Sequence, residues 1–385
     1  MKSISRKDII NMTVLLTLIF CYALKFFVPS FYAASDKYAG LFVFMCEGIL
    51  LINNYNVVKA IKNKDKEFFF IIALLIIIMI NLIIVHSGFG AYFTAANFAL
   101  ILYASDKIVL TKKQILVLSS AYMGVLLFWL VVLYPGYFGS YTAIFPLNTN
   151  GAATFSTYTA LCALILLEHF YTKNKWIELL IVLLFVRTIR LALWHRARGA
   201  FIILSIFIFF YYILKGKFIQ NKKIYTALIA LASIGSLVFV MFYTILGRTG
   251  FNLFLPIFYK NIFSGRENIW YEFYSYFIHK PITGIGTNLT IKSFVEFNVH
   301  NAMYDILVIH GVVVFAMTMI ILFKRFKSFR EKALDNKLAL IALLVLLAVF
   351  FESYIDMDLI WADYSMNLIF LLATINADYS QDEAK

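Results

Sequence analysis

Arginine is concentrated at two places in the chain where its charge could bind an anion. One group lies in a short stretch before residue 199 and the other in the connection at residues 247–301; they comprise Arg187, Arg190, Arg196 and Arg198, and Arg248, Lys260, Arg266, Lys280 and Lys292. A guanidinium stays charged at any working pH and can hold phosphate oxygens through two parallel hydrogen bonds. The groups therefore predict a phosphate or pyrophosphate site, with snorkelling to lipid headgroups as the alternative for the first group.

A histidine, His300, stands at the end of the same connection, directly before Asn301. A neutral imidazole can accept the proton of a hydroxyl, so His300 is a candidate base. The alternative is a helix cap or an interfacial residue. The role as a base is favoured because Arg198, Arg266 and His300 are all expected at the same membrane surface.

The composition places these residues in a membrane protein. Of the 385 residues, 62% are hydrophobic and 14% are charged, and the mean hydropathy is +0.84. A soluble domain is nearer half apolar and a quarter charged. The apolar residues form repeated runs of about twenty, the length of a helix that crosses a bilayer. The net charge of +13 does not indicate nucleic acid, because most basic residues lie in short loops between these runs.

About twelve apolar runs predict an all-α, polytopic membrane protein that forms a single integral membrane domain over residues 1–385. The predicted spans are 9–28, 38–58, 67–86, 91–105, 114–134, 151–170, 176–193, 199–214, 224–246, 302–323, 338–354 and 361–376. Alternate loops are basic, which is the positive-inside pattern. We expect a multi-pass protein of the bacterial cytoplasmic membrane, with both termini in the cytoplasm and the arginine groups outside.

The long outer connection, about residues 247–301, is expected to contain short interfacial helices. Ser264 and Glu267 have the spacing of a capping box, and the helix that they would begin should end before Pro281. Aromatic residues on this helix form a stripe suited to the membrane interface or to packing over the bundle; they are Trp270, Phe273, Tyr274 and Phe277.

Several motifs, in this order, resemble those of the O-antigen ligase and O-antigen polymerase superfamily. They are Arg198-Gly199-Ala200 at the start of a span, Ser264-Gly265-Arg266 followed by Trp270, Pro-Ile-Thr-Gly-Ile-Gly from Pro281 to Gly286, and His300-Asn301 followed by Gly311. Asn148-Thr149-Asn150-Gly151 resembles the Asn-rich segment of that family. The resemblance covers roughly residues 145–325. It departs from the family at Ala197, where serine is usual, and it lacks a clean copy of the arginine-rich repeats of the polymerase branch.

The resemblance implies a glycosyltransferase of the outer membrane face that needs no cofactor. Its donor and acceptor would be polyprenyl-pyrophosphate-linked oligosaccharides, with a flippase and a chain-length regulator as further partners. Arg198 and Arg266 would stabilise the pyrophosphate leaving group and His300 would act as base. Further substrate contacts are expected from Arg187, Arg190, Asn150, Asn301 and Glu267.

We expect a polymerase of O-antigen or capsular polysaccharide that joins repeat units. A ligase shares this chemistry and passes a finished glycan to another acceptor, so the motifs leave that branch open. A flippase for the same lipid-linked units is the transporter alternative. It should have repeated halves and charges near the midplane, whereas this chain concentrates charge in one outer loop and one outer turn.

Four further features of the sequence predict local structure. Gly284 and Gly286 predict a flexible turn. Lys25 and Glu47 predict an ion pair between the first two spans. Four asparagines within the spans predict hydrogen bonds between helices; they are Asn53, Asn54, Asn81 and Asn97. The carboxylates of Asp356 and Asp358 would suit Mg²⁺ or Mn²⁺, but two arginines at the pyrophosphate would make a metal unnecessary.

Overall fold

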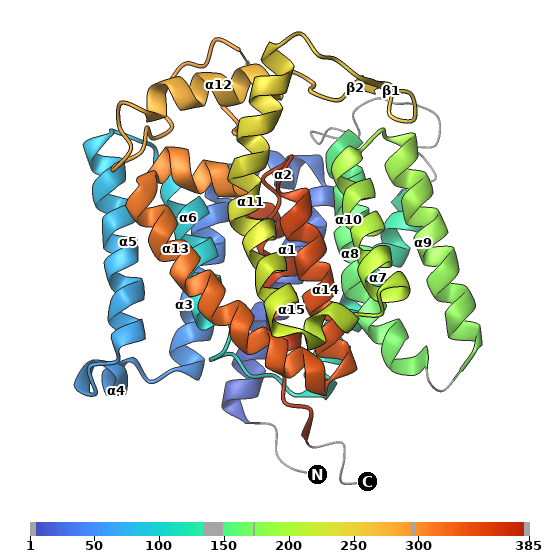
Figure 1. The fold of residues 1–385 in the computed structure, drawn as a ribbon. Coiled ribbons are helices and arrows are strands. Elements are labelled where there is room, and N and C mark those ends of the chain that lie inside the picture. The colour runs from blue at the N-terminus through green and yellow to red at the C-terminus, as the bar shows by residue number, and fades with distance from the viewer. Residues whose placement is uncertain (1–4, 134–148, 172–173, 294–296, 381–385) are drawn as a thin grey trace.

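The computed structural model describes residues 5–133, 149–171, 174–293 and 297–380, which form an all-α bundle with one very short β-hairpin (Figure 1). Within these residues, six helices are long and apolar enough to cross a membrane. They are α1 (Arg6–Phe27), α5 (Lys66–Ile84), α7 (Lys112–Leu127, continued by a π-helical segment), α8 (Thr149–Tyr171), α11 (Lys222–Arg248) and α13 (Ala302–Asp335). The chain is therefore a multi-pass membrane protein.

Shorter helices complete the bundle. A helix covers each of the twelve predicted ranges within the described residues, so the all-α prediction is confirmed. The shorter elements are α2 (Pro29–Ser35), η1 (Asp36–Tyr38), α3 (Ala39–Asn54), α4 (Val57–Lys62), α6 (Phe89–Ala104), η2 (Phe128–Leu133), α9 (Trp176–Trp194), α10 (Arg198–Ile208), η4 (Phe209–Ile213), η5 (Lys217–Gln220), β1 (Phe254–Leu255), β2 (Lys260–Asn261), α12 (Arg266–Phe277), α14 (Lys337–Glu352), η6 (Ala362–Tyr364) and α15 (Ser365–Ile375).

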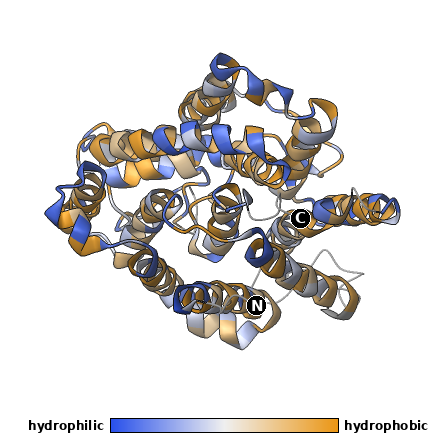
Figure 2. Cartoon of the chain, turned by 90° about the horizontal axis from the view of Figure 1, so that it is seen from below, coloured by the Kyte–Doolittle hydropathy of each residue, from blue (hydrophilic) through white to orange (hydrophobic). Residues whose placement is uncertain are grey.

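The helix α14 forms the centre of the bundle. Every residue from Ile341 to Phe350 is buried, and α14 packs against α8, α10, α11, α13 and α15. A helix that is apolar all round is stable where other helices surround it. Hydrophobic residues cover most of the helices in Figure 2, and many on the peripheral helices, such as Ile52, Ile76 and Leu180, are exposed as expected of a lipid-facing surface.

The two ends of the bundle carry different elements. α12 and the hairpin of β1 and β2 lie at one end, and the start of α1 and the end of the described chain lie at the other (Figure 1). The second end also holds the start of α7, because Thr111 forms a β-bridge with Asp378. We call these the α12 end and the terminal end.

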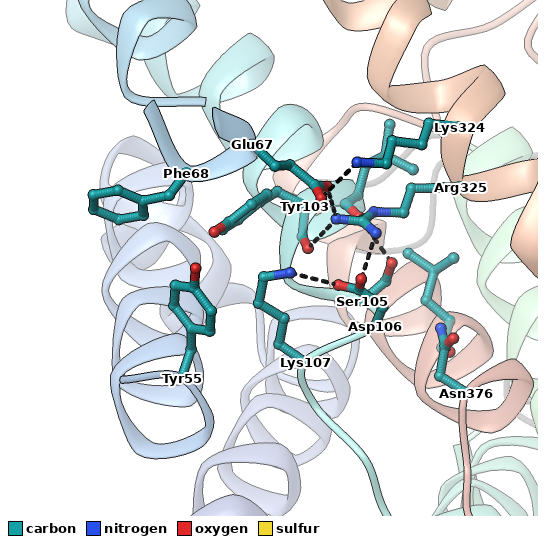
Figure 3. A network of polar contacts seen from close by, with 12 residues as sticks. Tyr55, Glu67, Phe68, Tyr103, Ser105, Asp106, Lys107, Lys324, Arg325 and Asn376 are labelled. Atoms are coloured by element: carbon teal, nitrogen blue, oxygen red, sulfur yellow. Dashed lines mark hydrogen bonds and ion pairs between the residues drawn. The ribbon is translucent and has the colours of Figure 1, made fainter. Parts of the chain in front are cut away.

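A cluster of ion pairs joins three helices at the terminal end (Figure 3). Arg325 of α13 is 3% exposed, and its guanidinium contacts Glu67 of α5, Asp106 and two backbone carbonyls of α6. Lys324 pairs with Glu67 at 2.7 Å, and Lys107 pairs with Asp106 at 3.1 Å. A charge inside a membrane bundle is tolerated when it is paired and hydrogen-bonded, as Arg325 is.

The segment from Pro281 to Gly286 is a docked segment, so the prediction of a flexible turn was wrong. It packs against a break in α13 at Gly311, whose φ is +88°. The amides of Ile285 and Gly286 donate to backbone carbonyls of α13 at 2.9 and 3.1 Å. A Cβ on Gly284 would lie 2.2 Å from a backbone oxygen, so a side chain has no room there. Glycine is required because the two backbones touch and because both glycines of the segment have positive φ.

The predicted asparagine bonds between helices are confirmed. The four side chains reach neighbouring helices at 2.7–3.1 Å: Asn53 and Asn54 contact Asn11, Asn81 bonds the carbonyl of His310, and Asn97 bonds that of Gly40.

The predicted pairing of Lys25 with Glu47 was wrong. Lys25 instead contacts Asp36, at 2.9 Å, and Asp363. Asp363 comes from the other end of the sequence, so adjacency of the first two spans could not indicate it. Glu47 is 2% exposed, and its carboxylate has no hydrogen-bond partner within the described part of the chain.

Candidate functional site

Arg198 is the first residue of α10 and fixes the hairpin connection to the bundle. Its Nη1 donates to the carbonyls of Asn261 and Ile262 at 3.2 and 2.8 Å, and its Nη2 donates to Ser264 Oγ at 2.8 Å. The Tyr243 hydroxyl of α11 lies 2.6 Å from the carbonyl oxygen of the same Ile262. Arg198 therefore uses three of its five N–H groups to position this segment.

Lys260 of β2 brings a third cation to Arg198 and Arg266. Its Nζ donates to the carbonyl of Arg196 at 3.2 Å. Burial, followed by the positive charges of Arg198, Arg266 and Arg196, lowers the pKa of Lys260. Cations that repel one another at close range create a positive potential, and this potential favours the binding of an anion.

Arg266 is the first residue of α12, and within the described part of the chain its guanidinium makes fewer hydrogen bonds than that of Arg198. Arg266 is half-buried, and its Nε has no hydrogen-bond partner among the described residues. The predicted capping box was wrong: the N-cap is Gly265, with φ +85° and no side-chain cap, and Ser264 Oγ binds Arg198 and Asn261 instead. Ser264 is thus used to hold Arg198, and Arg266 follows directly after it.

Glu267 lies beside Arg266 on the first turn of α12. Its Oε1 accepts from Asn268 at 3.2 Å, and its Cβ lies against Gly247 at the end of α11. A Cβ on Gly247 would approach Glu267 to 2.5 Å. Glu267 therefore packs α12 on α11, a contact that the spacing with Ser264 did not indicate.

His300 is held in place by the aromatic residues of α12. Trp270 is fully buried, and its Nε1 donates to the carbonyl of Val299 at 2.7 Å. The Tyr304 hydroxyl returns to the carbonyl of Trp270 at 3.1 Å. Trp270 and Phe273 of the predicted aromatic stripe therefore pack over the bundle, whereas Tyr274 is exposed, and Trp270 fixes the residue before His300.

Asn301 is the N-cap of α13. Its Oδ1 accepts from the amide of Tyr304 at 2.8 Å, and its Nδ2 donates to Ser236 and to the carbonyl of Tyr354. Next to it, the amide of Ala302 donates to the carbonyl of Ser353. Asn301 is fully buried and joins the start of α13 to the chain after α14.

This junction brings Asp356 to His300. The Nδ1 of His300 lies 3.8 Å from Asp356 Oδ1, and the two side chains are 19% and 28% exposed. Burial opposes ionisation of Asp356, but the contact with His300 and the charge of Arg266 outweigh it and lower the pKa of Asp356. Burial and the neighbouring Asp356 and Asp363 raise the pKa of Asp358. The two aspartates therefore differ: Asp356 lies beside the histidine, and Asp358 is buried.

Glu352, at the end of α14, is a buried carboxylate that the sequence analysis missed. It is fully buried, and neither carboxylate oxygen has a hydrogen-bond partner in the described ranges. A Cβ on Gly199 would lie 2.5 Å from Glu352 Oε1, so the glycine after Arg198 makes room for this carboxylate. An acidic residue at the end of an apolar run was the signal that could have found it.

The structure therefore brings the three predicted catalytic residues into one electrostatic cluster. Arg198 binds Ser264, two positions before Arg266, and His300 lies 3.8 Å from Asp356, a carboxylate that interacts electrostatically with both arginines. We call Arg198, Lys260, Arg266 and His300 the Arg–His cluster. Three separate segments supply its residues, and the cluster lies at the α12 end.

Three other residues that were predicted to contact the substrate lie on α8 and α9. Arg187 is half-buried and Arg190 exposed on α9, a peripheral helix that packs on α8 and α10. Asn150 is half-buried in the first turn of α8, and its Oδ1 lacks a hydrogen-bond partner among the described atoms. Asn148 of the same motif lies outside the described residues.

The cluster can bind an oxyanion through fixed cations while an imidazole beside it accepts a proton. No protein-family model matches the chain, and no curated protein matches it either.

Replacing Trp270 with phenylalanine is expected to loosen the segment before His300. The change removes the Nε1 donor, so the buried carbonyl of Val299 loses this hydrogen bond. The loss should lower the free energy of unfolding by about 1–3 kcal/mol. Thermal unfolding in detergent measures the loss. Trp194→Phe, at an exposed tryptophan of α9, is the matched control; equal stability of the two variants would contradict the positioning role.

Anion affinity is expected to fall as pH rises, starting below the pH at which an ordinary lysine titrates. The reason is the lowered pKa of Lys260, which loses its charge beside Arg196, Arg198 and Arg266 early in an alkaline titration. Titration of the purified protein with inorganic pyrophosphate at increasing pH measures the effect. Lys260→Arg should flatten the profile and the exposed Lys280→Arg should not; a profile unchanged in Lys260→Arg would exclude Lys260 from the site.

Proposed function

We propose that this protein is a glycosyltransferase of the O-antigen ligase and polymerase superfamily, acting as a polymerase of O-antigen or capsular polysaccharide. It would join polyprenyl-pyrophosphate-linked oligosaccharide repeat units at the outer face of the bacterial cytoplasmic membrane. The observation that carries the proposal is the gathering of Arg198, Arg266 and His300, from three distant segments, at one end of a membrane bundle.

The proposed reaction is a single displacement. The acceptor hydroxyl oxygen forms a bond to the anomeric carbon of the donor while the bond from that carbon to the pyrophosphate oxygen breaks. His300 accepts the hydroxyl proton. The lipid pyrophosphate leaves with the electron pair, and Arg266, Arg198 and Lys260 stabilise its negative charge. Inversion at the anomeric carbon is expected from this geometry.

Asp356 supports His300 in this scheme. An ionised carboxylate beside Nδ1 can orient the imidazole and stabilise the imidazolium that forms after proton transfer, and Nε2 is then the nitrogen that accepts the proton in this scheme. The lowered pKa of Asp356 keeps this carboxylate charged at neutral pH.

The proposed topology has twelve spans, with the α12 end outside and both termini in the cytoplasm. The basic loops support it, because many of their lysines lie at the terminal end; α4 with Lys59 and Lys62 lies there, as do Lys324 and Arg325. The donor suits this orientation, since nucleotide sugars are absent outside the cell and the leaving group must arrive on a lipid.

Deletion of the gene tests the proposal. Surface polysaccharide is separated by size, and the lipid-linked precursors are analysed alongside. Loss of long chains with single repeat units on the outer leaflet would support the polymerase. Complete polymer retained on its lipid would identify a ligase instead, and single units trapped on the cytoplasmic side would identify a flippase and remove the roles given to the Arg–His cluster.

A further inference from the structure

A cavity opens at the α12 end, and the residues of the Arg–His cluster do not line it. Its volume is about 630 Å³, and it lies between α2, η1, the starts of α3 and α6, and η6. Aromatic and polar side chains line it together, among them Tyr32, Asp36, Tyr38, Phe93, Thr94 and Trp361. This volume is in the range of small-ligand sites.

The charges around this cavity are balanced. Asp36 and Asp363 line it, together with Lys37. Lys25, 6% exposed, lies beneath and contacts both carboxylates. Two acids thus face two lysines, whereas the Arg–His cluster has an excess of cations. An anion is therefore favoured at the cluster, and an uncharged polar ligand is favoured in the cavity.

The cavity is connected to His300 by one short piece of chain. Asp356 contacts His300, and Trp361, five positions later in the same loop, lines the cavity. A fully extended chain covers at most ~3.6 Å per residue, so these two positions are separated by no more than ~18 Å. Asp358, between them, lies within electrostatic range of both Asp356 and Asp363. A ligand a few sugar rings long could occupy the cavity while its end reaches the base.

We propose that this cavity binds the acceptor saccharide, with the attacking hydroxyl at His300 and the following sugars against Trp361, Tyr38 and Tyr32. This assignment rests on the proposed glycosyl transfer and deepens it. The donor pyrophosphate then occupies the Arg–His cluster, and the sugars of the acceptor reach His300 from the cavity.

The side chains suit a carbohydrate. A sugar ring has a face of C–H groups, which packs on an aromatic ring, and an edge of hydroxyls, which need donors and acceptors. Trp361 and Tyr38 are 43% and 57% exposed, so their rings are available for such packing. Asp36 and Thr94 supply polar groups at the same cavity.

Direct binding tests the assignment on the full-length protein in detergent. The probe is a set of oligosaccharide fragments of the source cell's own surface polysaccharide, titrated without any donor. Wild-type protein should bind a fragment, and Trp361→Ala and Tyr38→Ala should each weaken binding by about tenfold or more. Trp176→Ala, at an exposed tryptophan of α9, is the matched control and should bind as wild type does.

Kinetics with the same fragment as soluble acceptor and lipid-linked donor give the second measurement. Trp361→Ala should raise the KM for the acceptor by a similar factor and leave the KM for the donor within about twofold. Absence of fragment binding by wild type, or equal binding by Trp361→Ala and Trp176→Ala, would overturn the saccharide site. Failure of the proposed function is a different result: fragment binding would remain sensitive to Trp361, while no donor is consumed.

Discussion

Replacing His300 with alanine is expected to lower glycosyl transfer by about 10²–10⁴-fold, the usual effect of removing a positioned base. Membrane insertion should be unchanged, because the backbone at this position is held by neighbours. The Trp270 indole holds the carbonyl of Val299, and Asn301 caps α13. Without the imidazole, the acceptor hydroxyl has no group to take its proton, while the cations that bind the pyrophosphate remain.

Complementation of a deletion strain measures the change through the length of surface polysaccharide, with the amount of protein in the membrane determined in parallel. His279→Ala is the matched control, since His279 is exposed just after α12, at the same end of the bundle. Long chains made by His300→Ala at normal protein levels would remove the base assignment. Loss of pyrophosphate binding in this variant would instead mean that His300 contributes to the anion site.

The helices of this protein could be predicted from its sequence because lipid requires each span to satisfy its own backbone. Apolar runs therefore marked every helix of the bundle core. Asn81 and Asn97 were predicted for a related reason: an amide within an apolar span needs a partner on another helix. The clustering of Arg198, Arg266 and His300 was expected because the alternation of basic loops predicts all three at the same membrane surface.

The sequence could not predict which residue of a distant segment a given side chain contacts. Lys25 forms ion pairs with Asp36 and Asp363, and not the predicted pair with Glu47, because the fold brings the start of η6 to the end of α1. The contact of Asp356 with His300 and that of Glu352 with Gly199 could not be predicted for the same reason, since each joins segments far apart in the sequence. Ser264 had capping-box spacing, yet its hydroxyl binds Arg198, because a long-range guanidinium bond replaced the local cap.

Exchanging Arg266 for lysine is expected to lower transfer by about 10²-fold, although the charge is kept. Loss of one fixed donor to a developing negative charge typically costs that much or more. A lysine ammonium is a point charge and cannot reproduce the two parallel bonds of a guanidinium on a pyrophosphate. The fold should survive, since Arg266 Nε holds no hydrogen-bond partner among the described residues and α12 packs through the buried Trp270 and Phe273.

Arg198→Lys should behave differently, and the comparison separates positioning from leaving-group stabilisation. Arg198 binds the carbonyls of Asn261 and Ile262 and the hydroxyl of Ser264, so its exchange removes bonds that hold the hairpin connection. Both transfer and thermal stability should fall in Arg198→Lys, whereas Arg266→Lys should lose transfer and pyrophosphate affinity at nearly normal stability. Arg248→Lys is the control, because Arg248 is exposed at the same end and stacks on Tyr271 at 3.6 Å. Normal transfer by Arg266→Lys would mean that Arg266 contacts lipid headgroups and that the leaving group is stabilised by Arg198 and Lys260 instead.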